Sequence, residues 1–229
     1  MNIRNAHQRL YIIVSLILFS LAVTWIDAVV HPSYFTKIPI KILFFLALPL
    51  LYFAIWRAEA PAFRQLFRFE PRGLLISFLL GSAIYALITG GFFLTRSVFD
   101  YSAVTGNLTD GMGITSAQFP LVAVYISVFN SFLEEFFFRG FGFMALRRCA
   151  GPKLSWLLSP VLFAVYHVGM TAGAFQPILL GLMMTGLILG GLIFNALNRY
   201  FHSIYPSWFV HMAADAAIMT VGAVLFGLL

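Results

Sequence analysis

The sequence predicts an all-α membrane protein, a polytopic bundle of seven to eight transmembrane helices. Its 229 residues are 61% hydrophobic and only 10% charged, whereas about a quarter of the residues of an average soluble protein are charged. The apolar residues fall into long runs, and about 20 apolar residues are enough for a helix to cross a bilayer. Because little length remains for a soluble domain, residues 1–229 are predicted to form a single integral membrane domain.

Seven apolar runs are predicted to be the spans. They are residues 10–30, 38–56, 74–94, 119–146, 154–168 and 177–197, and a last run that begins after Tyr205, Pro206 and Ser207. Residues 57–72 mix four arginines with Phe and Leu, which predicts a short amphipathic segment on the membrane surface. Residues 96–118 are rich in turn-forming residues and are predicted to be a long polar loop. The small-xxx-small pair Gly186 and Gly190 predicts close packing of the sixth span against a neighbouring helix.

The basic residues predict how the chain is oriented. Ten fall on the loops of one side: Arg4, Arg9, Arg57, Arg64, Arg68, Arg72, Arg147, Arg148, Lys153 and Arg199. Lys37 and Arg96 fall on the other side, and Lys41 lies just inside the second span. This bias predicts a cytoplasmic N-terminus. The net charge of +6 therefore reflects topology, and no nucleic-acid partner is expected. The compact chain without targeting extensions fits a prokaryotic inner membrane.

Seven ionisable residues remain at membrane depth, where a charge is costly and is by default a sign of function. They are Asp27, Glu134, Glu135, Arg139, His167, His211 and Asp215. Asp27 fits no motif, and an interfacial anchoring role is expected for it. The single Cys149 excludes an intramolecular disulfide and a cysteine-based zinc cluster.

Helical spacing predicts which of these groups meet. Glu135 and Arg139 are four residues apart, with the acid first, which favours an ion pair along one helix face. Asn130 lies one turn before Glu134 and is expected to hydrogen-bond to it. His211 and Asp215 likewise share a face. Because imidazoles and carboxylates in hydrocarbon need partners, the two histidines and Asp215 are expected to converge with Glu134 inside the bundle.

Three motifs in this order resemble those of a known family. Glu134-Glu135-Phe-Phe-Phe-Arg139 fits EExxxR, Phe163-Ala-Val-Tyr-His167 fits FxxxH, and His211-Met-Ala-Ala-Asp215 fits HxxxN/D. The sequence thus resembles the CAAX prenyl protease 2 and bacteriocin-processing (CPBP, or Abi) family of intramembrane endopeptidases. The resemblance covers a protease core of about residues 119–217, and the first three spans carry no matching motif.

The resemblance implies hydrolysis of a peptide bond near the C-terminus of a membrane-anchored protein or peptide, close to the cytoplasmic side of the lipid bilayer. The substrate would carry a prenylated CAAX-like tail or a C-terminal sorting segment. Glu134 and His167 would activate water, His211 and residue 215 would stabilise the oxyanion, and Glu135 and Arg139 would hold the site in place. Many members have Asn at the last position. An ionised Asp215 only accepts hydrogen bonds, so orienting His211 or binding a metal suits it at least as well.

Two alternatives stay open. A zinc ion would be bound by Glu134, His167 and His211, with water in the open position. Because no HExxH is present and the family is closer to a glutamic-type mechanism, no cofactor is favoured and zinc remains possible. The second alternative is a non-catalytic transporter or a partner-binding or bacteriocin-immunity protein that uses the buried acids. A transporter would more often show paired repeats with broken helices, which this sequence lacks.

The depths of the motifs add one structural expectation. In simple spans Glu134 and His167 would lie much deeper in the bilayer than His211, at about 1.5 Å of rise per residue. The residues converge if the fourth and fifth spans protrude or tilt, or if residues 198–206 dip inward, and we expect the dip. The many phenylalanines are expected to face the bilayer.

Overall fold

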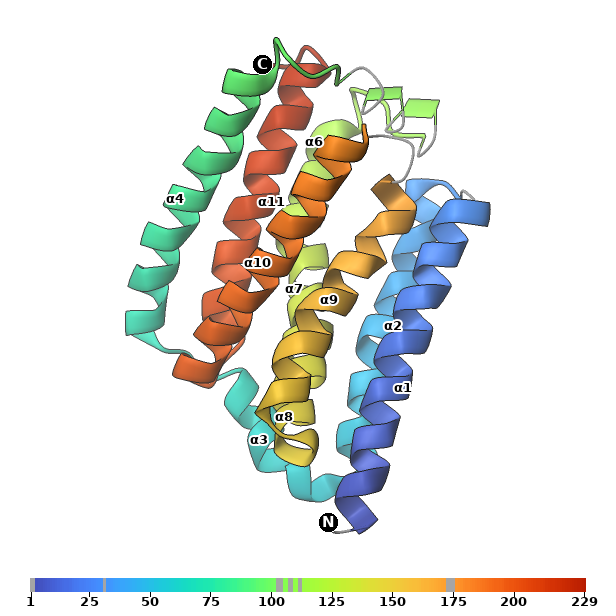
Figure 1. The fold of residues 1–229 in the computed structure, drawn as a ribbon, viewed down its shortest axis with the longest axis vertical. Coiled ribbons are helices and arrows are strands. Elements are labelled where there is room, and N and C mark those ends of the chain that lie inside the picture. The colour runs from blue at the N-terminus through green and yellow to red at the C-terminus, as the bar shows by residue number, and fades with distance from the viewer. Residues whose placement is uncertain (1–2, 31, 102–104, 107–108, 111–112, 172–175) are drawn as a thin grey trace.

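All regular structure in the described part of the chain is helical (Figure 1). The computed structural model describes residues 3–30, 32–101, 105–106, 109–110, 113–171 and 176–229. The elements are α1 (Ile3–Trp25), η1 (Ile26–Val30), α2 (Tyr34–Ile55), η2 (Arg57–Glu59), α3 (Ala60–Leu66), α4 (Pro71–Thr95), α6 (Phe119–Val124), η4 (Tyr125–Asn130), α7 (Ser131–Glu134), η5 (Glu135–Ala145), α8 (Leu146–Ala150), α9 (Pro152–Thr171), α10 (Pro177–Phe201) and α11 (Tyr205–Leu225).

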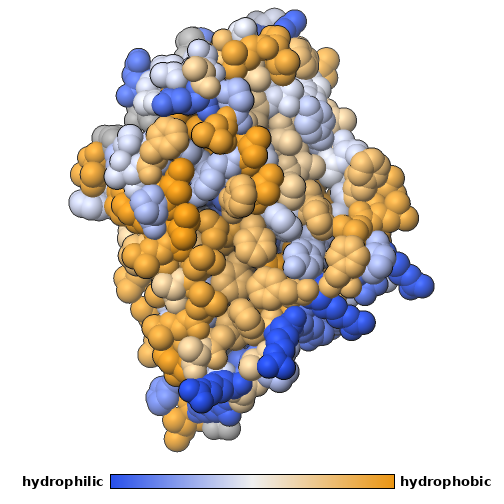
Figure 2. Space-filling view, turned by 180° about the vertical axis from the view of Figure 1, so that it is seen from behind, coloured by the Kyte–Doolittle hydropathy of each residue, from blue (hydrophilic) through white to orange (hydrophobic). Residues whose placement is uncertain are grey.

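The predicted helical membrane bundle is confirmed. Within the described ranges, six helical segments are long and apolar enough to cross a membrane, and α9 is a further long helix between them. The observed helices begin and end within a few residues of the predicted spans, except that α1 begins seven residues earlier. Figure 2 shows a broad apolar band, with hydrophilic residues gathered at the end where α1 begins. The predicted loop at residues 96–118 lies partly outside the described residues.

The fourth span is the centre of the bundle. It runs without a break from α6 to α8. Within its most apolar stretch of 18 residues, 50% are buried, against 11–33% in the corresponding stretches of the other five candidate spans. Helices α1, α2, α9 and α11 pack on it. Its segments η4 and η5 are π-helical, and π-helical turns within helices are frequent at functional sites. The motif EExxxR therefore lies in the most enclosed part of the fold.

The expectation that the phenylalanines face lipid is wrong for this central span. The exposed fraction of each of its enclosed phenylalanines is at most 2%: Phe136, Phe137, Phe138, Phe141 and Phe143. Their rings pack on aromatic residues of α1, α2 and α9, namely Phe19, Phe45 and Tyr166. A helix that is surrounded by others has no lipid-facing side, so its apolar residues become the core.

The expected close contact at Gly186 and Gly190 is also wrong. A Cβ atom added at either glycine would have no atom of the described residues within 4 Å. The next glycine, Gly191, makes the contact instead: a Cβ there would lie 2.7 Å from Pro160 Cβ and 3.1 Å from a guanidinium nitrogen of Arg139. Successive residues of a helix lie about 100° apart around its axis. The spacing of Gly186 and Gly190 therefore indicates a face of small residues, whereas the face that meets α9 carries Gly191.

Gly169 allows α9 to touch the backbone of α1. A Cβ atom there would overlap the carbonyl oxygen of Thr24 and lie 2.9 Å from its Cα. We expect Gly169→Ala to lower the free energy of unfolding by about 1–3 kcal/mol, because neither backbone can yield cheaply. Gly186→Ala is the matched control, since its Cβ enters open space. Thermal unfolding in detergent micelles measures both, and equal midpoints for the two variants would contradict the contact.

The turn between α10 and α11 is drawn into the bundle. His202, with φ of 56°, ends α10. The Ser203 hydroxyl and the Ile204 backbone N–H both donate to the carbonyl of Leu66 at the end of α3, at 3.2 and 2.9 Å. In Figure 1 this turn stops short of the α8–α9 turn at the same end of the molecule. The inward position of this turn agrees with the expected dip. It brings His211 closer to the depth of Glu134 in the bundle.

Candidate functional site

Glu134 lies at the end of α7, and its side chain is 3% exposed. Its Oε1 accepts a hydrogen bond from Asn130 Nδ2 at 2.5 Å, as the spacing predicts, and a second from the Tyr166 hydroxyl at 3.0 Å. Among the described residues its Oε2 makes no hydrogen bond, and His211 Nε2 lies 3.7 Å from it, which is longer than a hydrogen bond. The two oxygens of this carboxylate therefore differ: Oε1 is held in place and Oε2 is open.

His211 on α11 is held between the two adjacent acids. Its Nδ1 donates to Glu135 Oε1 at 3.0 Å, and its Nε2 lies 3.7 Å from Asp215 Oδ1 as well as from Glu134 Oε2. The ring of Phe194 stacks on the imidazole, with 5.1 Å between centroids. Because an ionised carboxylate only accepts hydrogen bonds, Nδ1 carries a proton and Nε2 is the atom directed at Glu134.

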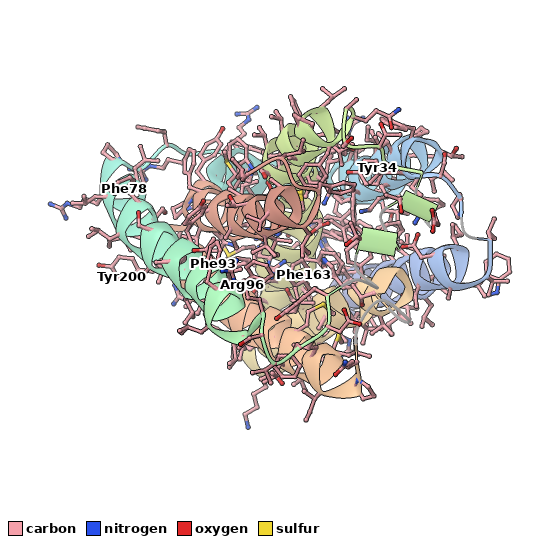
Figure 3. The ribbon with its side chains drawn as sticks, turned by 90° about the horizontal axis from the view of Figure 1, so that it is seen from above. Tyr34, Phe78, Phe93, Arg96, Phe163 and Tyr200 are labelled. Atoms are coloured by element: carbon pink, nitrogen blue, oxygen red, sulfur yellow. The ribbon has the colours of Figure 1, made fainter. Side chains whose placement is uncertain are left out.

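Arg139 pairs with Glu135, the carboxylate that accepts a hydrogen bond from His211. Its side chain is fully buried, and its Nη1 lies 3.3 Å from Glu135 Oε1, so the ion pair predicted from the spacing is present. The guanidinium lies over the rings of Phe163 and Phe194, at 4.0 and 4.9 Å from their centroids. Seen along the bundle in Figure 3, Phe163 lies inside the ring of helices, whereas Phe78 lies at its rim. The charge is thus enclosed by aromatic faces and one carboxylate.

His167 takes a different position from the other predicted residues. Its Nδ1 lies 2.7 Å from the carbonyl oxygen of Phe163, one turn earlier in α9. Because a carbonyl only accepts, Nδ1 is protonated and the neutral ring presents a lone pair at Nε2. Within the described residues, no hydrogen bond or ion pair joins His167 to Glu134. The neighbouring Tyr166 makes that contact instead.

Two residues of this site were missed at the level of sequence. Lys41 on α2 has its Nζ 3.9 Å from Glu134 Oε1 and 5.0 Å from the centroid of the Tyr166 ring. Its place near the start of the second span groups Lys41 with the basic residues that indicate topology, although a lysine inside an apolar span is itself a signal of function. Tyr166 lies within the FxxxH motif at one of its unspecified positions. Asp27, expected to be an interfacial anchor, forms a 2.7 Å ion pair with Lys37.

In the residues for which the structure gives positions, no group of three or more His, Cys, Asp or Glu side chains could hold a metal ion. Asp215 Oδ2 is buried and has no hydrogen-bond partner there. The arrangement offers a fixed carboxylate as a base, an oriented imidazole beside it, and polar groups directed at the same small volume.

One comparison with known proteins covers the residues of this site except Lys41. Residues 116–217 match the family model described as type II CAAX prenyl endopeptidase Rce1-like. This match confirms the resemblance that the three motifs indicate, over almost the same residues. Searches of curated proteins and of solved structures found no significant match.

Proposed function

Since residues 116–217 carry the type II CAAX prenyl endopeptidase Rce1-like region, we propose that this chain cuts a peptide bond near the C-terminus of a membrane-tethered protein. The family match supports intramembrane endopeptidase activity in general. The observation that carries the specific proposal is the Glu134 carboxylate, with one oxygen held by Asn130 and Tyr166 and the other open toward His211. A buried, oriented carboxylate of this kind is suited to take a proton from water.

In the proposed mechanism, Glu134 Oε2 accepts the proton of the attacking water. The hydrogen bonds to Oε1 fix the carboxylate and decide which oxygen reacts. The Nε2 lone pair of His167 is not used by the bond from Nδ1 to its own helix. It accepts the water proton from Glu134 and passes it to the leaving amine as the intermediate collapses. The mechanism is of the glutamic type and needs no metal.

His211 is proposed to stabilise the oxyanion of the tetrahedral intermediate. In its protonated form, Nε2–H is a charge-assisted donor, and the Glu135 carboxylate at Nδ1 stabilises the imidazolium. Asp215, one turn later, orients the ring through its contact with Nε2. Arg139 acts through Glu135, because its ion pair keeps that carboxylate in place.

The substrate is proposed to enter from the cytoplasmic side. The basic residues of η2, α3 and α8 lie at the end of the bundle where α1 begins, as a cytoplasmic N-terminus requires. A lipidated C-terminal tail is concentrated at that surface and held next to the apolar helices. The prenylated CAAX-like tail is the first candidate, and a C-terminal sorting segment is the second.

The proposal is tested with purified protein in liposomes. Two fluorogenic peptides of one sequence, with and without a prenyl group on the cysteine near the C-terminus, are compared with a transmembrane peptide that ends in a sorting segment. We expect the prenylated peptide to be cut within a few residues of its C-terminus and the unmodified one to be cut far less. Failure to cut any membrane-tethered peptide would contradict the endopeptidase function.

The same assay tests the glutamic-type mechanism. We expect cleavage to be unchanged after prolonged treatment with 1,10-phenanthroline and dialysis, because the proposed base is a carboxylate with its own hydrogen bonds. Loss of activity that added Zn²⁺ restores would favour the metal alternative. A known zinc protease in the same buffer serves as the positive control for chelation.

A further inference from the structure

Lys41 is an enclosed cation that makes one long ion pair, with Glu134, in the described part of the chain. It belongs to α2, outside the family match, and its side chain is 14% exposed. Within the described residues it makes no hydrogen bond: its Nζ lies 3.9 Å from Glu134 Oε1 and over the Tyr166 ring. A lysine at this depth costs free energy unless it is paired or functional. A role confined to stability would be expected to show a closer ion pair.

Lys37, one turn earlier on the same face, shows what a structural lysine looks like in this helix. Its Nζ lies 2.7 Å from Asp27 Oδ1, so the charge is neutralised by direct contact. Lys41 lies 1.2 Å farther from its nearest acid, at 3.9 Å against 2.7 Å. Its three N–H groups are therefore available to a molecule that enters the site.

The site needs such a donor because of what surrounds the reacting group. Asp215 Oδ1 lies 3.7 Å from His211 Nε2, and as a carboxylate it only accepts hydrogen bonds. The Nδ1–H of His211 is already bonded to Glu135, so even the protonated ring offers a single N–H, at Nε2, to the reacting group. An oxyanion accepts more than one hydrogen bond, and the Lys41 ammonium beside Glu134 is placed to be the second donor to the developing negative charge.

We propose that Lys41 is a further catalytic residue, whose ammonium group donates to the carbonyl oxygen of the scissile peptide bond. This role rests on the proposed endopeptidase function. The water oxygen bonds to the carbonyl carbon, the water proton passes to Glu134, and the C=O π pair becomes the oxyanion beside Lys41. On collapse the carbonyl re-forms, the C–N bond breaks, and the proton that Glu134 took from water reaches the leaving amine through His167 Nε2. Lys41 keeps its own protons throughout.

The test compares Lys41→Met, Lys41→Arg and the double control Asp27→Asn/Lys37→Met in the liposome assay. Lys41→Met is expected to lower kcat by about 10²- to 10³-fold with little change in KM, because a donor to the oxyanion acts in the transition state. Lys41→Arg keeps the charge and is expected to regain part of kcat. The control removes the neighbouring ion pair and leaves no unpaired charge, so near wild-type kcat is expected.

Stability separates this role from a structural one. Lys41→Met removes one member of a long, enclosed ion pair, so it is expected to lower the unfolding midpoint by less than Arg139→Met, which breaks the closer pair with Glu135. Lys41→Met that unfolds earlier and keeps its kcat would overturn the catalytic role while the endopeptidase function stands. If wild type and Glu134→Gln are equally inactive toward every peptide, the endopeptidase function is overturned, and the role of Lys41 with it.

Discussion

Glu134→Gln is expected to abolish cleavage in an ordinary assay, a fall in kcat of about 10²- to 10⁴-fold, because a positioned general base contributes that much. The amide oxygen can still accept from Asn130 and Tyr166, so the side chain stays where the carboxylate was. What is lost is the open oxygen that takes the proton. The variant is therefore expected to fold, to bind substrate and to stop before hydrolysis, which makes it a substrate trap.

Three measurements check this expectation. Cleavage of the prenylated peptide reports kcat, the unfolding midpoint reports folding, and pull-down from membranes reports trapped substrate. Glu70→Gln is the control, since Glu70 precedes α4 outside the site and is expected to leave all three unchanged. Retained cleavage by Glu134→Gln would reject the glutamic-type mechanism. Loss of substrate binding together with cleavage would assign Glu134 to binding instead.

The helices and part of the site followed from the sequence for simple physical reasons. A bilayer requires long apolar helices, so the spans could be placed to within a few residues. Local pairs followed from helical periodicity: Asn130 bonds Glu134, and Glu135 pairs with Arg139. The inward position of the α10–α11 turn was predictable because His211 lies so soon after it and has to reach Glu134.

Contacts between distant segments were not predictable in the same way. Lys41 and Glu134 are 93 residues apart in the sequence, and no spacing rule relates α2 to α7. Whether Tyr166 or His167 faces Glu134 depends on how far α9 is rotated against a π-helical segment. The inward-facing phenylalanines show the same limit, because a helix that is apolar on all sides does not reveal which side meets lipid.

Arg139→Met is expected to be among the most destabilising single substitutions in the site. Removing one member of a buried ion pair leaves the other charge uncompensated, which costs about 3–5 kcal/mol. Glu135 would keep only His211 as a partner, and the space between the rings of Phe163 and Phe194 would lose its cation. Arg139→Lys is not expected to restore stability, because an ammonium is not planar and cannot stack on both rings.

Arg148→Met provides the matched comparison. Its Nε lies 2.7 Å from Glu59 Oε2, a shorter distance than in the buried pair, but the Arg148 side chain is 33% exposed. An exposed pair contributes about 0–1 kcal/mol, so this variant should unfold almost like wild type. Unfolding in mixed micelles measures both, and equal losses would contradict the uncompensated charge at Glu135. Adding Glu135→Gln to Arg139→Met should recover part of the stability while kcat stays low, because the carboxylate that holds His211 is then gone.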